Sequence, residues 1–220
     1  MIPTKKNIYS LVLSDDVVEA VDNLARAQGL SRSAMINQIL AERVAYTTPE
    51  MRMREVLASI QRSMGDVFYL TEQPSAGTLL CRSSLKYRYQ PTVKYSVELF
   101  SHGGRRVGEL RVSFRTKNSQ LINDLVRFFT CWAGLEQKYI ADKISQDIIY
   151  SIETGKFTRT LNMPQNDISD DDLGQTVADY MTMFDEIMKA YFAELPEEKS
   201  AAAAAENAYA QAISNQKYII

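Results

Sequence analysis

The sequence has little of what most catalytic and metal sites need. Its 220 residues include one histidine and two cysteines. Cys81 and Cys131 do not form a Cys-x-x-Cys pair, so neither a zinc site nor a disulfide framework is expected, and reduced thiols are the default. His102 lies in a His-Gly-Gly turn. No common phosphate-binding loop and no serine-histidine-aspartate set is found. We therefore expect no enzyme activity, no metal and no other cofactor.

Long hydrophobic runs are also missing. No stretch approaches the roughly 20 apolar residues of a membrane span, and the apolar run after Lys5 and Lys6 is too short for a signal peptide. These absences favour a cytoplasmic protein without membrane contact. The 45% hydrophobic content is ample for a globular core, and the length suggests one or two domains.

Charge is unevenly distributed along the chain. The formal net charge is −2 overall, but +1 over residues 1–64, +5 over residues 65–160 and −8 over residues 161–220. The middle is basic and the end is acidic. A contact between the two would cover the basic part.

Residues 5–44 give the strongest local pattern. Residues 7–13 alternate, which predicts a short β-strand. Ser14 then stands at a helix N-cap position, and Gly29 suits the left-handed residue that ends this helix. Ser31 can cap a second helix, whose apolar stripe includes Met35 and Ile39. One strand and two short helices are too small to fold alone, so we expect two copies to pair their strands antiparallel.

This segment resembles the ribbon-helix-helix family of the Arc, MetJ and CopG kind. The resemblance implies a homodimeric, sequence-selective DNA-binding protein, a transcriptional regulator that often represses its own operon. Its paired β-ribbon would enter the major groove of double-stranded DNA. The resemblance assigns base-facing positions at Ile8, Ser10 and Val12, supplemented by Lys6 and Asn7. It also assigns a phosphate anchor, which consists of Ser31, Arg32 and Ser33.

The predicted base-facing residues depart from the family's usual polar side chains. Ile8 and Val12 can touch only a thymine methyl group, and Ser10 discriminates poorly between bases. The alternative is a protein-interaction factor, in which the same dimer uses its apolar ribbon face against another protein. In that case the ribbon is covered by another part of the chain or by a partner.

Beyond residue 48 the sequence predicts a larger α+β body. Residues 49–72 contain a connecting helix that begins at Pro49. Three alternating runs, at residues 85–89, 93–99 and 110–114, predict a three-stranded antiparallel meander. A helix over residues 118–151 should pack on its apolar face and bury Trp132. Residues 73–160 would then form an α+β domain, with a boundary loop near residues 73–77.

Basic side chains are expected on the outer face of this meander. The candidate secondary surface consists of Lys86, Arg88, Lys94, Arg111 and Arg115. It could bind a nucleic acid backbone or a phosphate-bearing effector, although cross-strand pairing with Glu98 and Glu109 explains a mixed face equally well. The sequence identifies no effector.

The last 60 residues are expected to form an acidic helical region over residues 161–220. Asp170, Asp171 and Asp172 should begin a helix, because its dipole favours negative charge there. After Pro196 the sequence is alanine-rich and helix-prone with little apolar stripe, which predicts a partly ordered tail.

Overall fold

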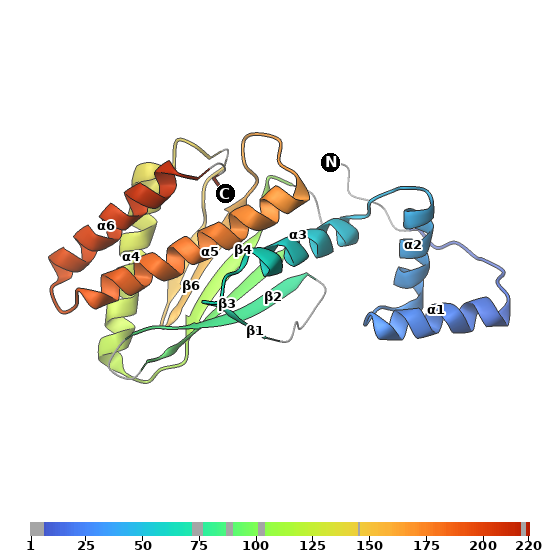
Figure 1. Cartoon of the computed structure of the whole chain (residues 1–220), viewed down its shortest axis with the longest axis horizontal. Coiled ribbons are helices and arrows are strands. Elements are labelled where there is room, and N and C mark those ends of the chain that lie inside the picture. Colours follow the sequence, from blue (N-terminus) through green and yellow to red (C-terminus); the bar gives the residue numbers. More distant parts are fainter. Residues whose placement is uncertain (1–6, 72–76, 87–89, 101–103, 145, 217–218) are drawn as a thin grey trace.

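The computed structural model describes residues 7–71, 77–86, 90–100, 104–144, 146–216 and 219–220. An N-terminal unit (residues 7–48) contains helices α1 (Asp15–Ala27) and α2 (Arg32–Arg43). It lies at one end of the molecule, and α3 (Pro49–Ser63) leads from it into the body, residues 49–220 (Figure 1). The body adds helices α4 (Ser119–Tyr139), α5 (Asp170–Ala193) and α6 (Glu198–Ser214). None of the described helices has the length and apolar character needed to cross a bilayer.

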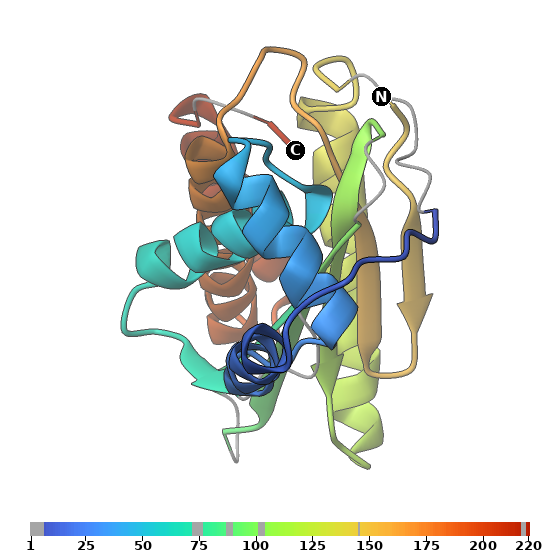
Figure 2. The same ribbon diagram turned by 90° about the vertical axis from the view of Figure 1, so that its right-hand side faces the viewer.

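One six-stranded antiparallel sheet organises the body. Its strands are β1 (Tyr69–Thr71), β2 (Thr78–Ser84), β3 (Thr92–Leu99), β4 (Arg106–Phe114), β5 (Tyr150–Glu153) and β6 (Lys156–Asn162). They lie in the order β1-β2-β3-β4-β6-β5. Figure 2 shows α3, α5 and α6 on the same side of this sheet. The α+β class predicted from the sequence is confirmed.

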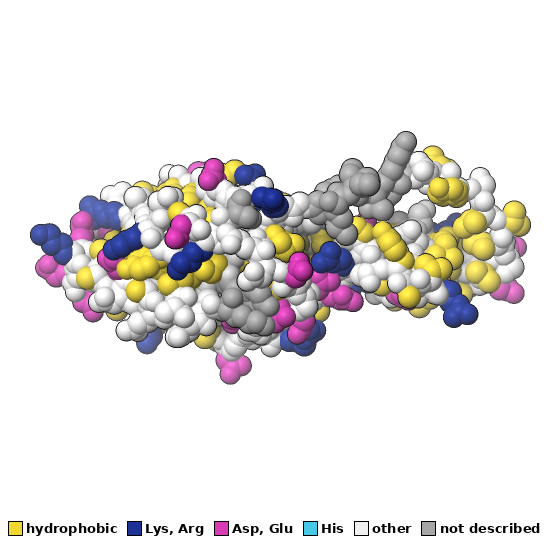
Figure 3. Space-filling view, turned by 90° about the horizontal axis from the view of Figure 1, so that it is seen from above, with side chains coloured by type: hydrophobic (Ala, Val, Ile, Leu, Met, Phe, Trp, Pro, Cys, Tyr) yellow, Lys and Arg dark blue, Asp and Glu magenta, His cyan; other side chains and the backbone are white. Residues whose placement is uncertain are grey.

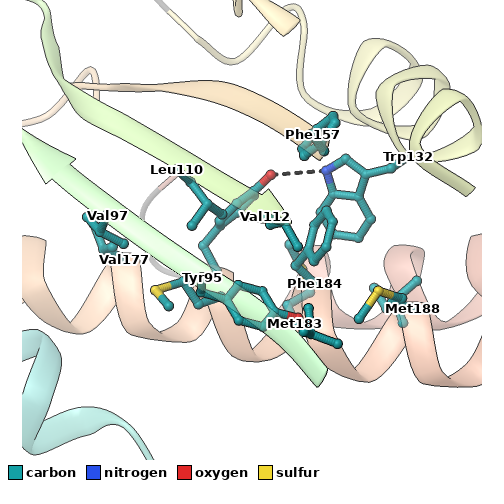
Figure 4. Packing of buried hydrophobic residues seen from close by; sticks show 14 of the residues in the cluster. Tyr95, Val97, Leu110, Val112, Trp132, Phe157, Val177, Met183, Phe184 and Met188 are labelled. Atoms are coloured by element: carbon teal, nitrogen blue, oxygen red, sulfur yellow. Dashed lines mark hydrogen bonds between the residues drawn. The ribbon is translucent and has the colours of Figure 1, made fainter. Parts of the chain in front are cut away.

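The core lies between the sheet and the helices. Val93, Tyr95 and Val97 alternate inward along β3, opposite buried residues of β4. From α4, Phe129 stacks on Phe157 of β6, with ring centroids 5.1 Å apart. Trp132 is fully buried, as predicted, and packs edge-on against Phe184 of α5 (Figure 4).

The predicted meander is the centre of this larger sheet. The runs at 93–99 and 110–114 are strands β3 and β4, and the strand paired with β3 on its other side is β2, Thr78–Ser84. Leu85 follows β2, and residues 87–89 lie outside the described residues. The alternation in β2 is hard to see because two of its inward positions hold the small side chains of Cys81 and Ser83.

The helix predicted over residues 118–151 was too long. It begins at the expected place, where Asn118 Oδ1 accepts a hydrogen bond from the backbone N–H of Leu121 at 2.9 Å, but it ends at Tyr139. The antiparallel hairpin of β5 and β6 follows and turns through Gly155 with φ of +67°. This Thr-Gly turn was the signal that the prediction missed.

The prediction of a partly ordered tail after Pro196 was also wrong, because this segment forms α6, which packs against the rest of the body. Its buried side chains recur every four residues and are Ala201, Ala205, Tyr209 and Ile213. Alanines this small do not stand out as an apolar stripe, yet they allow close approach to α4 and α5. Residues from α3, the sheet, α4, α5 and α6 belong to one core cluster. The domain boundaries given above remain predictions.

Candidate nucleic-acid interface

The N-terminal unit has its own small core. Val21 and Ala25 of α1 pack with Met35 of α2. Three further hydrophobic residues pack against them while partly exposed, namely Leu30, Ile36 and Ile39. Ala41 of α2 is buried as well. Four buried hydrophobic side chains are few for a folded unit, so the N-terminal unit has little apolar burial of its own.

The turn between α1 and α2 follows the helix-ending geometry predicted at Gly29. Gly29 has φ of +64°. Its backbone N–H donates to the carbonyl of Arg26, and that of Leu30 donates to the carbonyl of Ala25 at 2.8 Å, which is the Schellman pattern. Ser31 caps α2 as expected, because its Oγ accepts from the backbone N–H of Ala34 at 3.3 Å. This turn fixes the position at which α2 begins.

Arg32, the predicted phosphate anchor, already has an acidic partner. Its Nε and Nη2 donate to the two carboxylate oxygens of Asp22 at 2.6 and 2.5 Å. The hydrogen bond with Arg32 lowers the pKa of the Asp22 carboxyl, and the same pair raises the pKa of Arg32. The guanidinium remains about half exposed, so a phosphate could reach it. Ser31 and Ser33 are exposed beside it.

The segment predicted to form the ribbon is extended but unpaired in this single chain. Residues 7–14 belong to no helix or strand, since the only partner expected for them is a second copy. Ile8 and Val12 are fully exposed, whereas Leu11 and Leu13 are 58% and 42% exposed. Asn7 and Ser10 are exposed as well, and Lys6 lies outside the described residues. Among the described base-facing residues, the body therefore leaves Ile8 and Val12 fully exposed.

Hydrophobic side chains gather on the surface of the N-terminal unit (Figure 3). Besides those of the extended segment, the exposed large hydrophobic residues of this unit are Val17, Leu24, Leu40, Val44 and Tyr46. A single small unit rarely leaves so many apolar side chains in water unless another surface covers them.

The candidate secondary surface is not a single basic patch. Lys94 and Arg111 are exposed on the face of the sheet turned away from the helices, but Arg111 pairs with Glu109 at 2.9 Å. Lys86 and Arg115 follow β2 and β4, whose ends lie at the same end of the sheet because both strands pair antiparallel with β3. Arg88 lies outside the described residues.

The arginines of α3 bind this helix to α5 on one side and to α2 of the N-terminal unit on the other. Arg52 Nη2 lies 2.7 Å from Asp170 at the start of α5, and Arg62 Nη2 lies 2.7 Å from Asp171. Arg54 Nη1 donates to Gln38 of α2 at 3.2 Å. Two of the three aspartates at the start of α5, Asp170 and Asp171, therefore pair with arginines of α3. No cluster of three metal-ligating side chains occurs in the part of the chain that the structure describes.

Two buried polar clusters in the body were missed by sequence reasoning. In the first, the Asp185 carboxylate accepts hydrogen bonds from Ser83 Oγ at 2.5 Å and Tyr95 Oη at 2.7 Å. In the second, Arg159 forms a fully buried ion pair with Glu136. The available signal was a charged residue at an inward position, such as Arg159 between Phe157 and Leu161 on β6.

Comparison with protein families gives a match for the N-terminal unit. Residues 10–47 match the model of the ribbon-helix-helix proteins of the copG family. Neither the curated proteins nor the solved structures include a significant match to the chain. The match ends just before α3, and the body lies beyond it. Residues 10–47 of this chain are therefore similar to the ribbon-helix-helix proteins of the copG family.

Proposed function

We propose that the protein is a homodimeric DNA-binding transcriptional regulator that acts in the cytoplasm. Two copies would pair residues 7–13 into an antiparallel ribbon, which enters the major groove of double-stranded DNA. The observation that carries this proposal is the N-terminal unit itself, because a segment similar to the CopG family begins with an exposed stretch, residues 7–14, that belongs to no helix or strand. Repression of the protein's own operon is the form of regulation that we expect.

The exposure of the extended segment supports the predicted faces. On the predicted inner face Leu11 and Leu13 are 58% and 42% exposed and Tyr9 is 78% exposed, while Ile8 and Val12 are open to solvent. In a paired ribbon the first set would turn toward the helices and the second toward DNA. No described helix of the body covers Ile8 or Val12, which favours DNA over a ribbon buried within its own chain.

The phosphate anchor would act through the first turn of α2. The helix dipole and the first backbone N–H groups favour an anion there, and Arg32 adds a charged donor. Asp22 holds that donor in a bidentate pair. A phosphate must therefore compete with Asp22, which lowers the affinity that Arg32 could otherwise provide.

The test is fluorescence anisotropy with a random-sequence duplex and with the native upstream fragment, across a salt series. We expect affinity to fall with salt, and Arg32→Ala to reduce the slope of log affinity against log salt by about 1. Asp22→Asn should tighten binding. Arg43→Ala is the matched control, because it removes the same charge from the other end of α2.

The outcomes separate DNA binding from the protein-interaction alternative. Preference for the upstream fragment would add a specific operator to general DNA binding. If the wild-type protein binds neither duplex at low salt, the proposal is refuted. The exposed apolar side chains of Ile8 and Val12 would then point to a protein partner for the ribbon.

A further inference from the structure

Arg159 lies at the centre of a polar cluster where β6, α4 and α5 meet. Its side chain is fully buried. Its Nη2 lies 3.0 Å from Glu136 Oε1, and its Cζ lies 4.5 Å from the centre of the Tyr180 ring. Tyr180 Oη donates to Glu136 at 2.9 Å and accepts from Trp132 Nε1 at 3.0 Å, the bond drawn in Figure 4. Breaking such a buried pair costs more than a surface pair.

The cluster has more hydrogen-bond donors than the described residues can satisfy. Arg159 Nη1 and Tyr209 Oη are both buried, and neither has a hydrogen-bond partner among those residues. Tyr209 belongs to the same cluster, since its ring packs on Trp132 with centroids 5.2 Å apart. A buried donor without an acceptor is costly, so each of these two groups would gain from a further acceptor.

Ile219 and Ile220 show which chemistry the cluster accepts. The carbonyl oxygen of Ile220 accepts a hydrogen bond from Arg159 Nη2. The Ile220 side chain is buried, and Ile219 packs against the same core while partly exposed. One oxygen acceptor, from Ile220, therefore lies on the guanidinium, and the branched aliphatic side chain of the same residue is buried.

We propose that the cluster around Arg159 is a ligand-binding site of the body, which takes a short branched aliphatic molecule with a carbonyl or carboxylate oxygen. In this structure Ile220 occupies the site as an internal ligand, and Ile219 precedes it in the chain. An incoming ligand replaces the Ile220 carbonyl on Arg159 and places a second acceptor near Arg159 Nη1 and Tyr209 Oη. The body is then the part of the protein that senses a small molecule.

Packed helices connect this site to the N-terminal unit. Tyr180 belongs to α5, whose first residue, Asp170, accepts two hydrogen bonds from Arg52 Nε and one from Nη2. The same helix α3 carries Arg54, which contacts Gln38 of α2. This route gives occupancy of the site a physical path to the DNA-binding part, and that regulatory consequence rests on the proposed DNA-binding function.

The test uses the full chain and two probes, N-acetyl-Ile-Ile and 3-methylpentanoate, with thermal shift and calorimetry. In the double variant Ile219→Ala/Ile220→Ala we expect a lower melting temperature, which saturating N-acetyl-Ile-Ile restores. The wild-type protein should bind the probe at least about tenfold more weakly, because its own residues occupy the site. Binding of 3-methylpentanoate to the double variant would extend the ligand class to small acids.

Tyr209→Phe, made in the double variant, is the matched control for the ligand contact. It removes an unpartnered hydroxyl, so the protein should remain folded, whereas loss of one hydrogen bond should weaken probe binding about tenfold. Arg159→Met should abolish binding. If neither probe shifts the melting temperature of the double variant at millimolar concentration, the ligand site is refuted. These measurements contain no DNA, so they test the ligand site independently of the DNA-binding proposal.

Discussion

Replacing Gly174 of α5 by alanine tests how closely α3 packs against α5. At Gly174 the two helices cross so closely that an added Cβ would lie 2.4 Å from Ser59 Cβ and 2.7 Å from the carbonyl oxygen of Val56. Both atoms are held by the backbone of α3, so no rotamer change relieves the clash. Ser59 Oγ also donates to the Asp171 carbonyl at 2.8 Å, and a separation of the helices would break this bond.

The change in the free energy of unfolding is the sum of one stabilising and two destabilising contributions. Alanine in a helix interior is favoured over glycine by about 1 kcal/mol. Overpacking a tight contact costs about 1–3 kcal/mol, and loss of a buried hydrogen bond costs about 1 kcal/mol. We therefore expect Gly174→Ala to lower the free energy of unfolding by about 1–3 kcal/mol. In a folding unit of this size, each kcal/mol lowers the melting temperature by about 2–4 °C.

The assay is thermal and urea unfolding of the full chain, with Gly134→Ala as the matched control. Gly134 also lies inside a helix, α4, but nothing lies within 4 Å of its added Cβ. The same substitution there should stabilise by about 1 kcal/mol. If Gly174→Ala proves as stabilising as Gly134→Ala, the close crossing of α3 and α5 is refuted.

Two further predictions concern the ribbon and a buried thiol. Leu11→Lys should dissociate the dimer in analytical ultracentrifugation, while Val12→Lys leaves it intact, since neighbouring strand residues face opposite sides; equal effects would contradict the predicted faces. Burial, and then the Asp185 charge, raise the pKa of the Cys81 thiol from 9.0 to about 12, so iodoacetamide at pH 8 should leave native Cys81 unlabelled. Because the folded thiol holds its proton more tightly, its contribution to stability is full below pH 9 and is lost as the pH rises toward 12.

The N-terminal unit could be predicted from the sequence because its signals are local. Helix caps such as Ser31 and a left-handed residue such as Gly29 act on their immediate neighbours, and the family match covers the same stretch. The pairing partner of residues 7–13, in contrast, is not a local feature of the chain. It would come from another molecule, so a single chain cannot show it.

The body was harder to predict because its pattern depends on distant contacts. The inward face of β2 includes Cys81 and Ser83, which do not look like core residues in the sequence. Both interact with Asp185 of α5, about 100 residues later: Ser83 donates a hydrogen bond to it, and its charge raises the pKa of Cys81. Arg159 looks like a surface residue until Glu136 and Tyr180 are seen around it. Inward polar residues of this kind are paired across the core, and no local window contains both partners.

The separation of the two cores has a consequence for any DNA-binding measurement. The body buries its own aromatic core, whereas the buried hydrophobic residues among those described in the N-terminal unit are four, namely Val21, Ala25, Met35 and Ala41. In the proposed dimer, the ribbon forms only when two copies pair, so formation of the ribbon and dimerisation would be one equilibrium. Stability that depends on association varies with protein concentration. DNA affinity should therefore appear weaker in dilute protein than the ribbon's own affinity, while unfolding of the body stays independent of concentration.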